Sequence, residues 1–299
     1  MSGKRYPVKY SVKKSGGRAA PVRRNRALAV RLLAALAVAT VVAVVPVLGQ
    51  TPSGDADAPL TSAGSVIQAA QDNMRLASFE AVTRMIINDG RGNSRTRELA
   101  MISAWYPEER VEKRLIRFLS PADVRGTGLL TWDHDEGSDD MWLYLPALRR
   151  ARRLASTEKS GNFMGSEFTY ADMTALSTDD FDYQLQGTGM VEGVLCYLLV
   201  QTPRDQRLER EYGFSRREIA VTAAELVIRQ ARYYDSRGRA TRTLTADRIT
   251  EIAPGRYRPL FMEMENLQNG RTSQLITDRW QTGEGVGTEY FTVPRLEQP

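Results

Sequence analysis

Cysteine, histidine and nucleotide-binding motifs are almost absent from this sequence, and each absence removes a class of function. The chain of 299 residues contains one cysteine, Cys196, so it cannot form an internal disulfide. Its one histidine, His134, excludes metal sites built from several histidines and leaves one possible Cys-His pair. There is neither a Gly-x-Ser-x-Gly elbow nor a glycine-rich phosphate loop. We therefore expect no enzyme activity, no metal site and no cofactor, with hydrolase as the least favoured alternative.

A net positive charge is found only in the first 49 residues. Ten of the 41 Lys and Arg residues lie there and none of the acidic residues does, so removing those ten charges from the net +5 leaves −5 for residues 50–299. Binding to nucleic acid needs a basic folded domain rather than a basic leader. The sequence therefore predicts a mildly acidic body that has no nucleic-acid partner.

One apolar run approaches the length of a membrane span. Residues 32–45 are apolar except for Thr40, a basic segment precedes them, and small and apolar residues follow as far as Gly49. This order is typical of a secretory signal peptide, and the run is shorter than the roughly 20 residues of a spanning helix. We expect export with cleavage after Gly49; a leader retained as an inner-membrane anchor is the alternative.

The remaining chain reads as a linker and one domain. Residues 50–60 are rich in Pro, Gly, Ala and Asp, which is typical of a linker. Residues 61–77 place Val66, Ile67, Ala70 and Met74 at helical spacing, which predicts an amphipathic helix. No further boundary is evident, so the expected domains are 1–49, 50–60 and 61–299.

Alternation of apolar and polar residues dominates the single domain. Short turn sequences such as Asp-Gly, Pro-Gly and Asn-Gly separate the alternating runs, which favours hairpins and a large antiparallel sheet. A second helical stretch is expected only near residues 166–177. The fold class is mainly β, with about eleven strands centred on residues 79–87, 97–106, 111–118, 128–132, 141–145, 181–186, 195–201, 225–234, 241–249, 257–266 and 272–280.

Several of these strands are apolar on both faces. Met141, Leu143 and Leu145 share one face of their strand, and Trp142 and Tyr144 occupy the other. Strands of this kind are covered on both sides. Two explanations remain open: ordinary packing of a curled sheet, or an apolar cavity that an acyl chain fills.

A resemblance to a known family gives these patterns a more specific interpretation. The most specific block is residues 158–173, EKSGNFMGSEFTYADM, directly after residues 145–155, LPALRRARRLA. Residues 117–123 (RFLSPAD), 125–128 (RGTG) and 290–293 (YFTV) extend the similarity over about 73–296. The chain resembles the outer-membrane lipoprotein-sorting-like family, relatives of the periplasmic lipoprotein carrier LolA that often accompany RND-type exporters.

The resemblance implies an incomplete β-barrel, in which a curved antiparallel sheet holds helices on its concave side with an apolar cavity between. It also implies a periplasmic carrier of lipid or lipidated protein, which delivers acyl chains toward the outer membrane with an RND-type inner-membrane exporter as possible partner. We further expect the protein to be a monomer. A non-carrying, membrane-tethered accessory protein of an exporter is the rival function.

The candidate ligand-binding residues lie in and around the most specific block. Two glycines flank Phe163 and Met164, which favours a loop that gates the mouth of a cavity, although a buried turn is an equally open alternative. Ten methionines suit a cavity that adapts to irregular guests, or they fill the core. The predicted tail-binding or gating residues are Phe118, Trp142, Tyr144, Phe163, Met164, Gly165, Phe168 and Tyr170.

Two charged clusters complete the candidates. The first, Arg149, Arg150, Arg152 and Arg153, is predicted to contact a phosphate headgroup or an acidic partner, with a solvated strand end as the alternative. The second, acidic residues 133–140, lies between two strands, where acids are good turn formers, so we expect a solvated hairpin there rather than a metal site.

Overall fold

The structure is a computed structural model that describes residues 60–175 and 178–298. The signal-peptide and anchor predictions for residues 1–49 and most of the linker lie outside these residues. Within the described ranges, no helix combines the length and the apolarity that crossing a bilayer requires.

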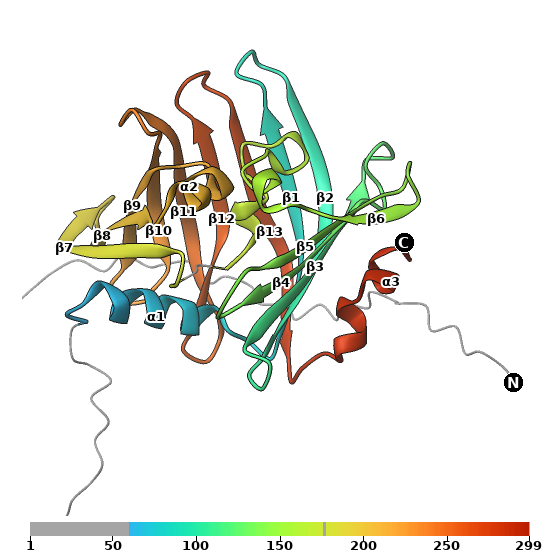
Figure 1. Cartoon of the computed structure of the whole chain (residues 1–299), viewed down its shortest axis with the longest axis horizontal. Coiled ribbons are helices and arrows are strands. Elements are labelled where there is room, and N and C mark those ends of the chain that lie inside the picture. Colours follow the sequence, from blue (N-terminus) through green and yellow to red (C-terminus); the bar gives the residue numbers. More distant parts are fainter. Residues whose placement is uncertain (1–59, 176–177, 299) are drawn as a thin grey trace, which may run out of the picture. The chain divides into compact units, whose positions relative to one another are not determined.

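A single antiparallel sheet dominates the described part of the chain, as predicted (Figure 1). Consecutive strands are neighbours in the sheet, except β6 and β7, which form its two edges; β1 pairs with β13 and joins the first six strands to the last seven. The spatial order is β6-β5-β4-β3-β2-β1-β13-β12-β11-β10-β9-β8-β7. The thirteen described strands are β1 (Ser78–Asn88), β2 (Ser94–Tyr106), β3 (Val111–Ser120), β4 (Gly128–His134), β5 (Asp140–Leu145), β6 (Arg150–Arg153), β7 (Phe181–Val191), β8 (Val194–Pro203), β9 (Arg216–Thr222), β10 (Ile228–Tyr234), β11 (Ala240–Ala253), β12 (Arg256–Asn266) and β13 (Thr272–Gly283).

Helices are short and few in the same residues. They are α1 (Ala63–Met74), α2 (Gln206–Tyr212) and α3 (Val293–Leu296), with 3-10 turns η1 (Ser156–Glu158), η2 (Phe163–Gly165), η3 (Ala171–Met173) and η4 (Thr288–Phe291). In the described part of the helical stretch expected at 166–177, only the single turn η3 forms.

The predicted N-terminal helix forms as α1 and is fixed at both ends. Ser62 caps its first turn through a hydrogen bond from the amide of Ser65, at 3.1 Å. At the other end, the Asn73 side chain donates to the Tyr257 carbonyl at 2.9 Å and accepts from the Tyr257 amide at 2.8 Å. The buried face of α1 therefore rests on the curved sheet, near β12 (Figure 1).

The two faces of the sheet have different covers. On the concave face lie α1, α2 and residues 156–174, which we call the plug segment (Figure 1). On the convex face of β2–β5 lie residues 286–297, the C-terminal cover, which carries η4 and α3. Both faces are apolar along these strands because both are buried.

Candidate functional site

A cavity of about 330 Å³ lies on the concave face, between the sheet, α1 and the plug segment. Its walls are mainly apolar, and methionines from several elements contribute to them, among them Met74, Met101, Met173, Met262 and Met264. Unbranched thioether side chains adapt to guests of irregular shape. Exposed Ala175 belongs to the lining, so the cavity reaches the molecular surface beside the plug segment.

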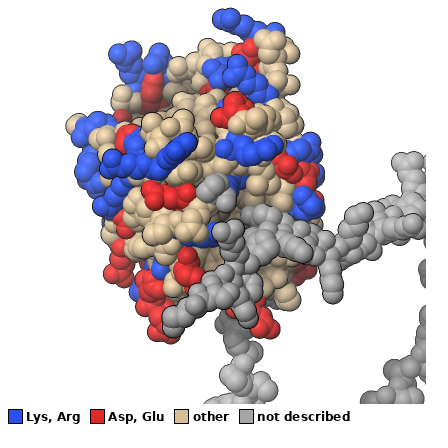
Figure 2. Space-filling model, turned by 90° about the vertical axis from the view of Figure 1, so that its right-hand side faces the viewer, with Lys and Arg blue, Asp and Glu red and all other residues tan. Residues whose placement is uncertain are grey.

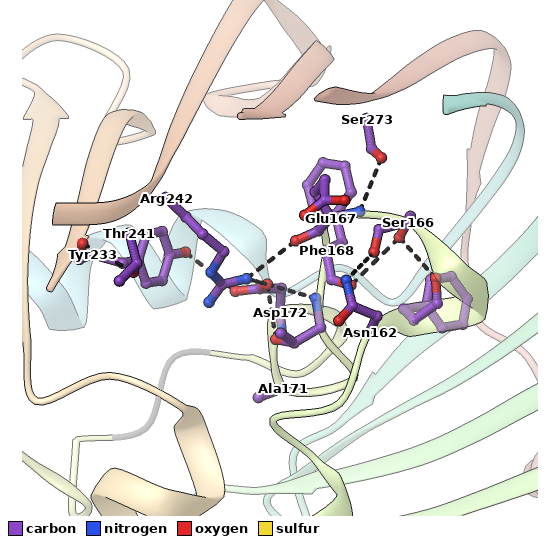
Figure 3. Close-up of polar contacts among 12 residues, drawn as sticks. Asn162, Ser166, Glu167, Phe168, Ala171, Asp172, Tyr233, Thr241, Arg242 and Ser273 are labelled. Carbon is purple, nitrogen blue, oxygen red and sulfur yellow. Dashed lines mark hydrogen bonds and ion pairs between the residues drawn. The ribbon is translucent and has the colours of Figure 1, made fainter. Parts of the chain in front are cut away.

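Polar side chains anchor the plug segment to β10 and β11. Asp172 accepts hydrogen bonds from Arg242 at 2.8 Å and from the hydroxyl of Tyr233 at 3.2 Å (Figure 3). The carboxylate also accepts from the amide and hydroxyl of Thr169, both at 2.8 Å. Burial opposes ionisation, yet the Arg242 charge and these donors hold the pKa of Asp172 below its usual range.

A second anchor joins the plug segment to β12 and β13. Glu167, buried, donates its amide to Ser273 at 2.9 Å (Figure 3). Its carboxylate accepts from Asn266 at 2.9 Å and pairs with Arg271 at 2.8 Å. Opening the segment would break both anchors, so these hydrogen bonds and ion pairs favour the closed arrangement.

One end of the cavity is charged rather than apolar. Glu112 and Arg114 project from the concave face of β3, and Asp133 from β4 and Arg258 from β12 complete this buried charge cluster. Arg114 donates to Glu112 at 2.9 Å and lies 3.5 Å from Asp133. Burial is the largest influence on all four groups, and it raises the pKa of Asp133 and lowers that of Arg258 to about 10.

A neighbouring ion cluster ties three elements together. Buried Lys159, from the end of η1, lies 2.7 Å from Glu211 on α2 and 3.7 Å from Asp139 in the β4–β5 hairpin. Burial raises the pKa of Asp139 to about 6, although the Lys159 charge counteracts part of the effect. The sequence predicted a solvated hairpin here, and the structure corrects this prediction. Glu136 is exposed at the tip of the hairpin, but Asp133 and Asp139 face inward.

Four predicted aromatic residues meet on the concave side. Phe163 and Phe168 line the cavity, and both are buried. Phe118 packs against Phe163 with ring centroids 5.7 Å apart, and Tyr170 meets Phe163 edge-on at 5.6 Å. Phe118 and Tyr170 thus support the wall of the cavity without lining it.

The remaining two plug residues lie farther out. Met164 is half-buried with a left-handed backbone, φ 50°, and its carbonyl accepts a hydrogen bond from Arg97. Gly165 follows at φ 76° and is exposed. Neither lines the cavity, and Phe163 is 1% exposed, so the structure shows a buried, anchored turn at the position where the sequence also allowed a gating loop.

Trp142 and Tyr144 require a correction. They lie on the convex face of β5, in the apolar cluster under the C-terminal cover, and they do not line the cavity. Trp142 meets Trp132 at 5.1 Å between ring centroids, and Trp132 donates to the carbonyl of Phe291 at 2.9 Å. The sequence correctly predicted that Trp142 and Tyr144 share one buried face of β5. That face is covered by the C-terminal residues of the chain rather than by a ligand.

The arginine cluster lies on the surface at β6, the edge strand. Figure 2 shows basic side chains gathered over the upper part of this side of the molecule and acidic ones below. Arg152 pairs with Glu158 at 2.8 Å and Arg153 pairs with Asp140. Within the described residues, exposed Arg149 and Arg150 have no ion pair. These two guanidinium groups are the part of the predicted patch that remains available to a partner.

Sequence reasoning missed the buried charge cluster. A signal existed, because Glu112 and Arg114 share one strand face with the apolar residues Ile116 and Phe118. Charged residues in the buried register of a strand indicate a paired or functional interior site.

Comparisons with known proteins agree with this geometry. A family model described as "uncharacterized protein" matches residues 110–298. A crystal structure of a domain described as an outer-membrane lipoprotein-sorting protein of Vibrio parahaemolyticus is 29% identical over 79% of this chain and 100% of that one, with a TM-score of 0.72. A DUF1329 family protein from Desulfovibrio piger is 30% identical over 78% of this chain and 98% of that one, with a TM-score of 0.71.

A LolA superfamily protein from Nitrosomonas europaea shares the fold, with a TM-score of 0.60 and 19% identity over 78% of this chain and 98% of that one. No match to this chain is found among curated proteins. The open, curved sheet around a cavity defines a protein of the LolA-like fold class, as the resemblance implied. Within that class, the chain belongs to the DUF1329 family.

Proposed function

We propose that this protein is a carrier that holds an acyl chain of a lipid or a lipidated protein in the concave cavity. The observation that carries the proposal is the mainly apolar cavity of about 330 Å³ inside a LolA-like fold. Burying hydrocarbon is favourable by about 0.8 kcal/mol for each methylene, so a sixteen-carbon tail gains on the order of 10 kcal/mol. That gain is enough for tight binding without chemistry on the ligand.

The carrier acts as a binding protein rather than an enzyme. The charged groups near the cavity are engaged with one another or with backbone groups, as in the Lys159 and Asp172 clusters. The similarity to a domain described as lipoprotein-sorting supports carriage as well. Retention of a tail needs only the apolar wall, an opening and an acceptor.

Location and partners follow from the same proposal. The basic leader and apolar run support export to the periplasm, and the carrier then moves its ligand toward the outer membrane. An RND-type inner-membrane exporter is the proposed donor, and Arg149 and Arg150 are proposed to contact an acidic surface or phosphate groups there. N-terminal sequencing of the protein from fractionated cells tests export: a mature chain starting near Gln50 supports it, and an intact leader supports the tethered accessory function.

The carrier proposal is tested on the purified protein. Extraction with organic solvent followed by mass spectrometry should release a lipid in near-stoichiometric amount, and the extracted, refolded protein should bind a fluorescent fatty acid. If the folded protein releases no lipid and does not bind the probe, the carrier function is contradicted and the non-carrying accessory function is favoured.

A further inference from the structure

Arg258 is a buried cation in the wall of the cavity that forms no ion pair with any of the described residues. Its side chain is 6% exposed. A hydrogen bond from Nη2 to the carbonyl of Met74, at 2.7 Å, holds the guanidinium at the end of α1, and Nε has no partner among the same residues. Arginine is almost never buried without a counter-ion, so Arg258 leaves a place in the cavity for an anion.

Other charged side chains of the lining are paired with opposite charges. Arg75 pairs with Asp135, and Asp172 pairs with Arg242 at 2.8 Å. These pairs are balanced within the protein and need no charge from a ligand. Arg258 differs from them because its only printed contacts are with a carbonyl and with the ring of Phe79, 4.4 Å from the guanidinium carbon.

The buried charge cluster around Arg258 does not supply the missing negative charge. Burial opposes the ionisation of Glu112, but the charges of Arg114 and Arg258 hold its pKa below the usual range. Its carboxylate accepts from Arg114, at 2.9 Å. Burial raises the pKa of Asp133 well above its usual range. With Asp133 protonated, two arginines face one carboxylate, and the cluster has an excess of one positive charge, which one negative charge on a ligand would balance.

The charges lie at one end of the cavity and the apolar wall lies beyond them. β3 and β12 run in the same direction, because three strands of the antiparallel sheet separate them. Each strand carries its charged lining residues first: Glu112 and Arg114 on β3, and Arg258 on β12. The apolar lining residues Ile116 and Met262 follow on the same strands. At about 3.3 Å per residue, Met262 lies roughly 13 Å farther along β12 than Arg258.

The charged end is also the end of the cavity next to the molecular surface. Exposed Ala175 belongs to the lining, and its amide donates to Asp133 at 3.2 Å. Asp133 lies opposite Glu112 in the register of β3 and β4. An amphiphile that enters tail first would therefore leave its head group at the charged end and extend its tail toward the methionines.

We propose that the cavity binds an amphiphile whose head group carries one negative charge, a carboxylate or a phosphate diester, and that this head group pairs with Arg258. A guanidinium group presents a planar set of donors that matches the oxygens of either anion. This inference rests on the proposed carrier function and adds the charge and the orientation of the ligand to it.

The test is displacement of the uncharged probe N-phenyl-1-naphthylamine from the delipidated full chain at about pH 8, below the micelle concentration of each competitor. Dodecanoate and dodecanamide share one tail and a head group of similar shape, but only dodecanoate is charged. We expect dodecanoate to bind at least about tenfold more tightly, because the amide leaves the charge of Arg258 unbalanced. Lauroyl lysophosphatidylglycerol has its single charge on a phosphate diester, so its rank against dodecanoate distinguishes the two sources of the anion.

The outcomes separate the head group from the carrier function. If dodecanoate and dodecanamide displace the probe equally well, the anion assignment is overturned and the carrier function stands. If the probe and all three competitors fail to bind, both proposals are overturned.

A matched pair of variants locates the head group. Arg258→Met removes the proposed partner and should weaken dodecanoate binding about tenfold, with dodecanamide binding within about twofold of wild type. Arg217→Met is the control: Arg217 also lines the cavity, but it donates to the neutral side chains of Gln201 at 2.6 Å and Tyr233 at 3.3 Å. This control should keep the preference for dodecanoate. A folded Arg258→Met protein with the wild-type preference, or loss of the preference in Arg217→Met alone, contradicts the proposal.

Arg258→Lys carries the test if the methionine substitution prevents folding. Lysine keeps the positive charge but lacks the planar set of donors, so the preference for dodecanoate should fall and yet stay above about threefold. Equal binding of dodecanoate and dodecanamide by the folded lysine variant would show that the charge at this position does not select the ligand, and the proposal would be wrong.

Discussion

The concave and convex faces of strands β2–β5 have similar apolar sequences but different covers. On the convex face, the C-terminal cover packs closely against the sheet, and Phe291 and Leu296 are fully buried. Leu296 lies so close to Gly128 that a Cβ there would come within 2.6 Å of its Cδ1. On the concave face, the plug segment leaves about 330 Å³ unfilled.

The difference lies in where each cover is held. The C-terminal cover combines apolar packing with hydrogen bonds to the strands that it covers: Tyr106 donates to the Val286 carbonyl, Arg117 to the Leu296 carbonyl and Trp132 to the Phe291 carbonyl. The plug segment is held by directed contacts of Asp172 and Glu167 to strands on the opposite half of the sheet. The segment also contacts β2 and β3, where Arg97 donates to the Met164 carbonyl and Phe118 packs on Phe163, so it spans the concave face and the cavity lies between it, the sheet and α1.

Truncating one phenylalanine on each face should give the largest effects. Phe163→Ala and Phe291→Ala each remove a ring that is at most 1% exposed, and each should lower the free energy of unfolding by about 3–5 kcal/mol. Urea unfolding measures these values. Only Phe163→Ala should change the affinity for a fluorescent fatty acid, because only Phe163 lines the cavity.

Met164→Ala is the control for the concave variant, since Met164 is half-buried outside the cavity and should cost about 1 kcal/mol or less. If Phe291→Ala weakened probe binding as much as Phe163→Ala, the two faces would not be independent and the comparison would fail.

Enlarging one residue on each face should give effects of intermediate size: on the concave face it should lower probe affinity, and on the convex face it should lower stability. Leu244→Trp projects into the cavity and should weaken probe binding by about tenfold or more with little change in stability, because free volume accepts the ring. Ile102→Trp projects into the filled convex cluster and should lower stability by about 1–3 kcal/mol while leaving probe affinity unchanged. Calorimetry measures the stability of both variants and titration measures their affinity for the probe. Equal changes in both quantities for the two variants would contradict the prediction.

Much of the fold could be predicted because its strands alternate cleanly. The eleven expected strands are present, and turns such as 136–138 and 254–255 fall where the sequence indicated. β6 was missed because Arg150–Arg153 carries almost no apolar alternation. β9 (Arg216–Thr222) was missed because two arginines and a glutamate occupy its first half, where ion pairs and aromatic rings cover them.

The candidate site was harder to predict. Periodicity showed that Trp142 and Tyr144 share a strand face, but a period of two does not say which face encloses a cavity. The contributions of Asp133, Lys159 and Arg258 depend on pairings between strands and helices far apart in sequence. No local spacing encodes such contacts.

Asp139→Asn should have the smallest effect on the free energy of unfolding. The sign of this effect shows whether the charged form of Asp139 stabilises or destabilises the folded protein. Burial raises the pKa of Asp139 to about 6 in the folded protein, against about 3.9 in an unfolded chain. Folding therefore favours the protonated form of Asp139. As a result, Asp139 makes the protein more stable as the pH falls from about 7 toward 4. The neutral amide removes this dependence and should raise the unfolding free energy at pH 7 by about 1–2 kcal/mol.

Urea unfolding at pH 7.5, 6 and 4.5 measures the difference between the two proteins, which should shrink as the pH falls. Lys159 keeps its closer partner Glu211, at 2.7 Å, so the substitution does not leave a buried cation alone. Glu136→Gln, on the exposed tip of the same hairpin, should stay within about 0.5 kcal/mol of wild type at every pH. An Asp139→Asn protein less stable than wild type at pH 7 would mean that the Lys159 pairing outweighs desolvation, and that the concave network stabilises the charged carboxylate after all.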